Sequence, residues 1–299
     1  MKPQKSDERV RHHRFSFLRS CVAISEQSSS DFSRATLIFV HGRFSAASHW
    51  LPLVEPLRAH FTSLLVDLPG FGNSFTLDDQ GPSLDESAEL LAQLISEFSS
   101  GPVFLIAHEM GSAIVQLCLL GKSLKEKDRI KGVILLNPLC LSHAIGTLSL
   151  NYGAYFLKRR LQKILKGCES LNPDQKQEVI EPWNHRSSRD SILQAFDAYQ
   201  QSWPDEEARS GWRNSLQDLK QPVLLLQGAQ DPINPPEHSF ELIRRLPEAY
   251  YFQNEKCGHW PSLEQPGWAN EKLRDFLWKY SNRSSHIESH LDPLHRKSA

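Results

Sequence analysis

The stretch that decides the fold runs from Val103 to Leu120 and reads VFLIA-HEMGS-AIVQLCLL. Its first five residues are all apolar, as in a strand buried on both faces. Its last eight have the apolar content of a buried helix. The turn between them is centred on Glu109, with the small residues Ala107 and Gly111 two positions before and after it. A strand, a sharp turn and a helix with small residues at these positions form the layout of a nucleophile elbow, G-x-S-x-G.

Further strands and helices alternate on both sides of this stretch. Short, almost wholly apolar runs predict a sheet buried on both faces, and their alternation with helices predicts an α/β fold with a mainly parallel twisted sheet. Residues 15–18 and 22–25 predict a short hairpin. The other predicted strands are Thr36–Val40, Leu64–Asp67, Val133–Leu136, Val223–Leu226 and Ala249–Phe252. The predicted helices are Leu84–Phe98, with a capping box from Ser83 and Glu86, Ser112–Leu120, Pro236–Leu246 and Trp268–Tyr280.

One long segment breaks the alternation. Residues 141–218 contain amphipathic helical patterns and no strand signal. A connection of this length inside a compact domain usually has a functional reason, so we interpret it as a helical cap inserted into the core. The predicted organisation is a flexible N-terminus (1–13), an α/β core (14–140 and 219–281), the cap (141–218) and a flexible tail (282–299).

The composition excludes several classes of function. The 34 Lys and Arg residues balance 35 Asp and Glu residues, whereas nucleic-acid-binding proteins usually carry a clear basic excess. No apolar run approaches the ~20 residues of a membrane-spanning helix, and the charged N-terminus lacks the apolar region of a signal peptide. Five scattered cysteines without a CxxC pair are interpreted as reduced thiols. We therefore expect a cytoplasmic protein without a nucleic-acid partner or membrane span. No pattern indicates its oligomeric state.

Three further motifs follow predicted strands. HGRF (41–44) follows the strand at 36–40, and Asp231 follows the strand at 223–226. CGHWP (257–261) places His259 28 residues after Asp231. The chain order of elbow, acid and histidine is the order of an α/β-hydrolase triad. An Asp–His pair of this kind fixes one ring nitrogen so that the other can accept a proton.

In order and spacing, these motifs resemble the α/β-hydrolase superfamily, and specifically its capped branch of esterases, epoxide hydrolases and haloalkane dehalogenases. The resemblance covers about residues 14–280. It implies a hydrolase that acts on a small molecule. Asp231 then matches the orienting acid and His259 the general base. The oxyanion hole would consist of the backbone N–H groups of Arg43, or Phe44, and of Met110, which together stabilise developing negative charge.

Glu109 departs from this pattern, because the family has Ser, Cys or Asp at the centre of the elbow. Ser112 lies three residues further, on the first turn of the helix, and is a poor substitute. Glu109 could be a carboxylate nucleophile that forms an ester with alkyl carbon, which water activated by His259 then hydrolyses. It could instead relay a proton in a His-based lyase or cofactor-free oxygenase. In a third interpretation, the protein is a non-catalytic member that binds a small ligand, and Glu109 forms a buried ion pair with His259 or Arg43.

The ligand pocket is expected between core and cap. Its candidate lining residues are Phe44, His108, Trp183 and Trp260. No Cys/His cluster has the spacing of a metal site, and we expect no metal and no cofactor.

Overall fold

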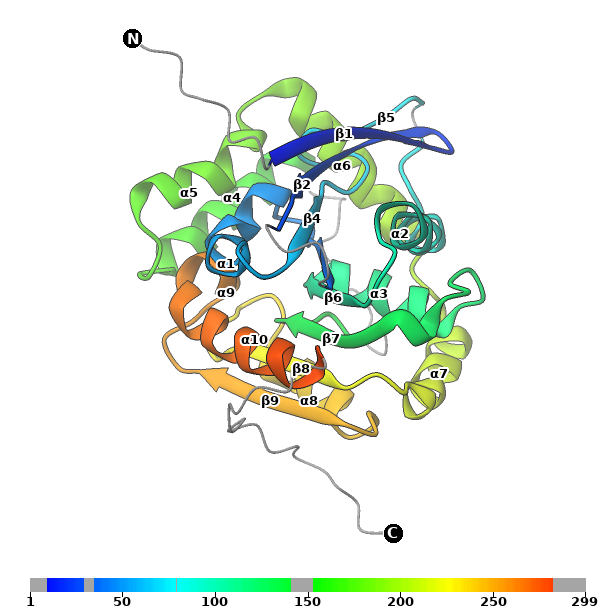
Figure 1. The fold of residues 1–299 in the computed structure, drawn as a ribbon. Helices are drawn as coiled ribbons and strands as arrows, with labels where there is room; N and C mark the ends of the chain where they lie inside the picture. Colours follow the sequence, from blue (N-terminus) through cyan, green and yellow to red (C-terminus); the bar gives the residue numbers. More distant parts are fainter. Residues whose placement is uncertain (1–9, 30–34, 79, 141–152, 282–299) are drawn as a thin grey trace, which may run out of the picture.

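A single sheet runs through the computed structural model, which describes residues 10–29, 35–78, 80–140 and 153–281 (Figure 1). The described strands follow the order β1-β2-β4-β3-β6-β7-β8-β9, and β5 pairs with β2. The pairs β4–β3, β3–β6, β6–β7, β7–β8 and β8–β9 are parallel. The pairs that β2 forms with β1, β4 and β5 are antiparallel. The strands are β1 (Val10–Phe17), β2 (Ser20–Gln27), β3 (Thr36–Val40), β4 (Thr62–Val66), β5 (Phe75–Thr76), β6 (Val103–His108), β7 (Ile130–Leu136), β8 (Val223–Gly228) and β9 (Ala249–Asn254).

The apolar strands bury side chains on both faces of the sheet, so each face has its own core. Leu37, Phe39 and Ile106 pack with residues of α1 (Leu51–Val54) and α10 (Pro266–Tyr280). Ile38 and Leu105, which point the other way, pack with residues of α2 (Leu84–Phe98) and α3 (Met110–Leu120). This alternation follows from the two-residue period of a strand. The predicted mainly parallel α/β fold is confirmed.

Helices flank the sheet and complete the core. The capping box of α2 is present, because the Ser83 hydroxyl accepts from the Glu86 amide (3.1 Å) and the Glu86 carboxylate accepts from the Ser83 amide (2.8 Å). The remaining core helices are α8 (Pro236–Ile243), α9 (Pro261–Glu264) and the 3-10 turns η1 (Ala47–Trp50), η2 (Glu55–Leu57) and η3 (Lys127–Arg129). Within the described ranges, no helix is both long and apolar enough to span a membrane.

The segment between β7 and β8 is helical where it is described, as predicted. It contains α4 (Gly153–Gly167), α5 (Pro173–Ile180), η5 (Glu181–Trp183), α6 (Arg186–Gln201), α7 (Glu206–Ser215) and η6 (Leu216–Asp218). In Figure 1, α4 and α5 lie together on one side of the molecule, and α7 lies apart from them on the opposite side. We use the word cap for α4, α5, η5 and α6, since α7 leads the chain back to the core.

The N-terminal boundary of the core differs from the prediction. Strand β1 begins at Val10, so residues 10–13 belong to the hairpin and not to a flexible N-terminus. The sequence VRHHRFSF is too polar to predict the full length of this strand. An edge strand with an exposed face lacks the continuous apolar run of an inner strand. The predicted flexible segments 1–9 and 282–299, and residues 141–152 at the start of the predicted cap, lie outside the described residues.

Candidate active site

The motif residues meet where the parallel strands end. Arg43 follows β3, Glu109 follows β6, Asp231 follows β8 and His259 follows β9. In an open α/β sheet, ligands bind at the carboxyl ends of the strands. The parallel register between β3 and β6, which pairs Val40 with Ala107, brings the first two of these loops side by side.

Glu109 sits at the tip of a strained elbow. Its backbone has φ 50° and ψ −117°, a conformation that non-glycine residues avoid. Strain of this kind persists only where the surroundings impose it. The Glu109 amide donates to the Leu136 carbonyl at 3.2 Å, and a Cβ atom added to Gly111 would lie 2.4 Å from the Val40 carbonyl oxygen. Glycine at 111 therefore allows the elbow helix to approach β3 closely, as the G-x-S-x-G layout requires.

The Glu109 carboxylate is fully buried and bound by Arg43. Its Oε2 accepts from the Arg43 backbone N–H at 2.8 Å, the group predicted as an oxyanion-hole donor. Its Oε1 accepts from Arg43 Nε at 2.7 Å and also from Nη2. Of the two predicted partners for Glu109, the structure places Arg43 in direct contact.

This pairing fixes the charge state of Glu109. Burial alone would raise the pKa of the carboxyl, but the charge and hydrogen bonds of Arg43, with a smaller contribution from His259, outweigh burial and lower the pKa to about 2. Glu109 is therefore an ionised carboxylate at neutral pH. The Arg43 side chain is only 5% exposed, so the ion pair is buried on both sides.

Asp231 and His259 form the predicted acid–histidine pair. His259 Nδ1 lies 2.9 and 3.0 Å from the two carboxylate oxygens of Asp231, and both side chains are fully buried. The Asp231 carboxylate also accepts from the amides of Ile233 (2.8 Å) and Asn234 (3.1 Å), which fixes its orientation. His259 Nε2 has no hydrogen-bond partner among the described residues. This nitrogen is therefore the one that can accept a proton.

Neighbouring negative charges raise the pKa of His259. Burial acts to lower its pKa, but Asp231, the hydrogen bond to it, and the charges of Glu109 and Glu264 together raise the pKa above the ordinary value of 6.5. His108, whose ring centroid lies 4.8 Å from that of His259, behaves in the opposite way. Burial and the charge of His259 lower the pKa of His108 to about 3, so His108 stays neutral.

Asn137, which sequence reasoning missed, joins the acid and histidine loops. Its side-chain amide donates to the Gly258 carbonyl and accepts from the Gly228 amide, both at 2.7 Å. The Asn137 backbone has φ 41°, a conformation that Asn tolerates better than most residues. The motif Asn-Pro directly after a strand was the available signal, since such a residue often starts a turn.

Removing the Asn137 side chain is expected to destabilise the fold. In Asn137→Gly the backbone conformation stays accessible, but two buried backbone groups lose their partners, at about 1–3 kcal/mol each. The matched control is Leu18→Gly, which also has a positive φ (48°) but a 63% exposed side chain, and its stability should not fall. Urea denaturation measures both. Equal stabilities of the two variants would contradict this role of Asn137.

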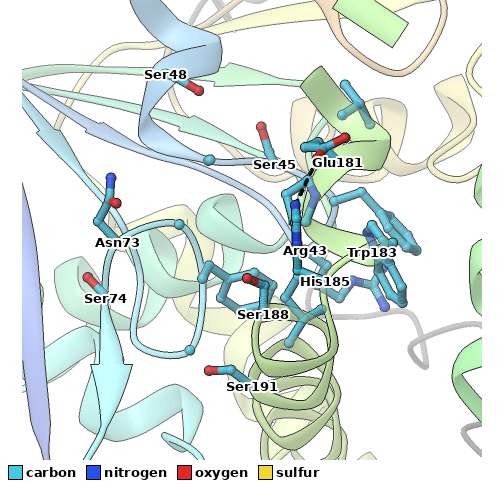
Figure 2. Close-up of a pocket in the computed structure, with 18 of the residues that line it drawn as sticks. Arg43, Ser45, Ser48, Asn73, Ser74, Glu181, Trp183, His185, Ser188 and Ser191 are labelled. Atoms are coloured by element: carbon cyan, nitrogen blue, oxygen red, sulfur yellow. Dashed lines mark hydrogen bonds and ion pairs between the residues drawn. The ribbon is translucent and has the colours of Figure 1, made fainter. Parts of the chain in front are cut away.

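A pocket of about 600 Å³ opens between core and cap, a size typical of small-molecule sites. Figure 2 shows Asn73 and Ser74 on one side, Arg43, Trp183 and His185 on the other, and Ser188 and Ser191 on a helix that closes the pocket. The lining combines aromatic rings with many hydroxyl groups. The aromatic side chains are Phe44, Phe71, Phe75 and Trp183, and the hydroxyl groups are those of Ser45, Ser48, Ser74, Ser187, Ser188 and Ser191.

Arg43 connects this pocket to the buried carboxylate, because it lines the pocket and binds Glu109. Two of the four predicted pocket residues, Phe44 and Trp183, line the pocket, with ring centroids 6.0 Å apart. His108 and Trp260 are not among its lining residues, which corrects that prediction. Both pack against the buried His259 ring instead, with centroids at 4.8 and 4.9 Å.

Ser112 does not replace the missing nucleophile. It lies inside α3, is fully buried, and its hydroxyl has no hydrogen-bond partner among the described residues. Its position one turn along the helix keeps it away from the tip of the elbow. The described residues also contain no group of three or more His, Cys, Asp or Glu side chains that could hold a metal ion.

Fold and site geometry define a protein of the α/β-hydrolase fold with Glu109 at the centre of its strand–helix turn. Residues 35–266 match the family model of the alpha/beta hydrolase fold, and the chain belongs to this family. A relative from Cupriavidus pinatubonensis, 2-hydroxy-6-oxononadienedioate/2-hydroxy-6-oxononatrienedioate hydrolase, is 25% identical over 81% of this chain and 86% of its own. The (E)-2-((N-methylformamido)methylene)succinate hydrolase of Acinetobacter baylyi is also 25% identical, over 81% of this chain and 89% of its own.

Solved structures support the same fold. A bacterial membrane phospholipase A superimposes with a TM-score of 0.72 at 22% identity, covering 92% of this chain and 88% of its own. A thermophilic esterase from Thermogutta terrifontis gives a TM-score of 0.68 at 19% identity, covering 91% and 99%. At these identities, the likeness concerns the fold alone.

Proposed function

We propose that the protein is a hydrolase that acts on a small organic molecule bound between core and cap, with Glu109 as a carboxylate nucleophile. His259 is the general base and Asp231 orients it. The observation that carries this proposal is the position of the Glu109 carboxylate. It lies on the elbow with Oε2 on the Arg43 N–H, at 2.8 Å, close enough to His259 for each charge to influence the other's pKa. The chain's membership of a family whose relatives are named as hydrolases supports it.

The reaction has two steps. Glu109 Oε1 attacks a substrate carbon and forms an ester bond, while the bond to the leaving group breaks and that group departs with the electron pair. His259 Nε2 then takes a proton from water, and the oxygen of that water bonds to the Glu109 side-chain carbonyl carbon. Negative charge develops on Oε2, where the N–H groups of Arg43 and Met110 stabilise it. Collapse expels the product alcohol, which receives the proton from His259, and leaves Glu109 as the carboxylic acid. Glu109 then loses the second proton of the water to solvent, which restores the carboxylate.

The first step requires Arg43 to release Oε1. In the structure, Nε and Nη2 of Arg43 both donate hydrogen bonds to this oxygen. The Arg43 side chain also lines the pocket, so a substrate that enters the pocket meets the guanidinium before it meets Glu109. Substrate binding would then draw the guanidinium away and expose the nucleophile.

The same contact favours a second candidate function, that of a ligand-binding protein without hydrolytic activity. If Arg43 never releases Oε1, Glu109 cannot attack. Neither Glu109 nor His259 is among the residues that line the pocket. A ligand would then contact Arg43 and the aromatic rings of the pocket only.

Trapping the ester tests the proposal directly. Wild type and His259→Gln are incubated with a panel of esters, epoxides and haloalkanes, and the peptide that contains Glu109 is analysed by mass spectrometry. We expect His259→Gln to retain the substrate's alkyl group on Glu109, because no base activates water. Glu109→Gln should show no adduct. Wild-type turnover in H₂¹⁸O should place the first ¹⁸O atom in Glu109 and not in the product.

The other results separate the alternatives. Turnover by wild type with no adduct and no ¹⁸O on Glu109 would exclude Glu109 as the nucleophile and favour a His-based reaction. No turnover of any compound, combined with a ligand-induced rise in melting temperature that Phe44→Ala abolishes, would favour the ligand-binding function.

A further inference from the structure

Glu264 is a buried carboxylate that the reaction above does not use. It ends α9, five residues after His259, and is 6% exposed. Its Oε1 accepts from the Trp260 backbone N–H at 2.8 Å, and its Oε2 accepts from the Gly258 backbone N–H at 2.9 Å. A buried polar group is costly unless it is hydrogen-bonded, and these contacts compensate the burial of the Glu264 side chain.

The two amides that Glu264 binds lie directly before and after His259. A carboxylate that holds both of them restricts the backbone rotations on each side of the imidazole. The Gly258 and His259 carbonyls are also held, by Asn137 at 2.7 Å and by His108 Nε2 at 2.7 Å. Hydrogen bonds therefore hold the backbone from 258 to 260, and Glu264 makes two of them.

Glu264 also reaches the cap. Its Oε2 accepts from the hydroxyl of Ser170 at 2.8 Å, and Ser170 lies between the cap helices α4 and α5. The neighbouring Leu263 carbonyl accepts from Gln175 Nε2 of α5 at 3.1 Å. Residues 263 and 264, shortly after His259, thus accept hydrogen bonds from two side chains of the cap segment, Ser170 and Gln175.

We propose that Glu264 is a positioning residue that couples the placement of the cap to the geometry of His259. This inference rests on the proposed function, since it assigns Glu264 a role toward the base of that reaction. A shift of the cap at Ser170 displaces Glu264 Oε2, the oxygen that also accepts the hydrogen bond from the Gly258 amide. The cap that shapes the pocket is in this way connected to the residue that activates water.

The charge of Glu264 provides a readout that does not depend on turnover. Three carboxylates raise the pKa of His259: Asp231, Glu109 and Glu264. Two further titratable groups face it, namely neutral His108 and the thiol of Cys168, which is hydrogen-bonded to the His259 backbone. Glu264→Gln removes one of the three negative charges and turns one acceptor oxygen into a donor. The titration midpoint of the His259 imidazole, followed by NMR, should move to lower pH.

The matched control is Glu271→Gln, which removes an acidic residue whose side chain is 56% exposed on α10 and should leave the midpoint unchanged. With a substrate in hand, Glu264→Gln is expected to lower kcat about 10- to 100-fold with little change in KM, since a misplacement of about 1 Å has an effect of that size. An unchanged midpoint together with an unchanged kcat would overturn the assignment.

Ser170→Ala tests the coupling to the cap with a change that the exposed Ser170 should tolerate. It removes only the cap hydrogen bond. We expect faster amide hydrogen exchange in α5 together with a change in the NMR signals of the His259 imidazole, because Ser170 and the Gly258 amide share Glu264 Oε2. Faster exchange in α5 with unchanged His259 signals, or unchanged exchange in α5, would refute the coupling. If no compound is ever turned over, the proposed function fails, but the NMR and exchange measurements still decide the role of Glu264.

Discussion

Replacing Arg43 with methionine is expected to lower the free energy of unfolding by about 3–5 kcal/mol, the usual effect of breaking a buried ion pair. The variant leaves the Glu109 carboxylate, which is 0% exposed, without its cationic partner. Glu109→Gln should have a smaller effect, about 1–3 kcal/mol, because its amide oxygen can still accept from Arg43. The double variant Arg43→Met/Glu109→Gln should recover part of the Arg43→Met loss, since no unpaired negative charge remains.

The matched control is Arg186→Met, whose side chain is 89% exposed and lies 3.6 Å from Asp190. Its loss should stay within about 0.5 kcal/mol, as for most surface changes. Chemical denaturation at pH 7 measures all four variants. If Arg43→Met is no less stable than Arg186→Met, or if the single losses simply add in the double variant, the ion pair does not support the fold as described.

The stabilisation by Glu109 also has a defined pH dependence. The pKa of Glu109 is lowered from the ordinary 4.5 to about 2, so its contribution is fully present above about pH 4.5 and is lost as the pH falls toward 2. Chemical denaturation should therefore show that the stability difference between wild type and Glu109→Gln shrinks as the pH falls from about 4.5 toward 2.

The second large effect is expected from Asp231→Asn. On a substrate that the wild type turns over, it should lower kcat by about ten-thousand-fold, as loss of the orienting acid does in a Ser-His-Asp triad. The reason is the pair of contacts at 2.9 and 3.0 Å between Asp231 and His259 Nδ1. The Asp231 carboxylate keeps the proton of the His259 ring on Nδ1, so that Nε2 is free to accept a proton. In Asp231→Asn this partner is lost, and Nε2 is no longer held in the form that accepts a proton.

The pH profile gives an independent measurement of the same pair. Activity requires neutral His259, whose pKa is raised above 6.5, so kcat/KM should rise with pH and reach half its maximum above pH 6.5. In Asp231→Asn, this midpoint should move to lower pH, and the plateau should fall. Asp190→Asn, which changes a half-exposed surface acid, serves as the control. A profile that Asp231→Asn leaves unchanged would show that His259 is not the base whose titration controls the rate.

Much of the fold could be predicted from local pattern. The strand Thr36–Val40 and the helix Leu84–Phe98 have the predicted bounds, because a fully buried strand and a capped amphipathic helix leave clear signals. The polar edge strand β1 and the two-residue β5 were missed or misplaced. Their pairing depends on neighbouring strands and not on their own composition.

The site was only partly predictable. The motifs predicted a sharp strand–helix turn centred on Glu109 and a contact between Asp231 and His259, and the structure contains both. Asn137 and Glu264 were missed, because each acts through backbone groups of distant loops, and such contacts leave little trace in a local pattern. His108 and Trp260 were placed in the pocket although they pack around His259, since a position next to a motif does not reveal where a side chain points.

The sequence by itself determined the α/β fold, the position of the elbow and the order of elbow, acid and histidine, because these features rest on local hydrophobic period and spacing. Only the tertiary structure decided which group binds the Glu109 carboxylate. Arg43 and Glu109 are 66 residues apart in the chain, and the pairing of β3 with β6 brings them together. The burial of both side chains then makes the ion pair the lowest-energy arrangement for a carboxylate that has no access to water.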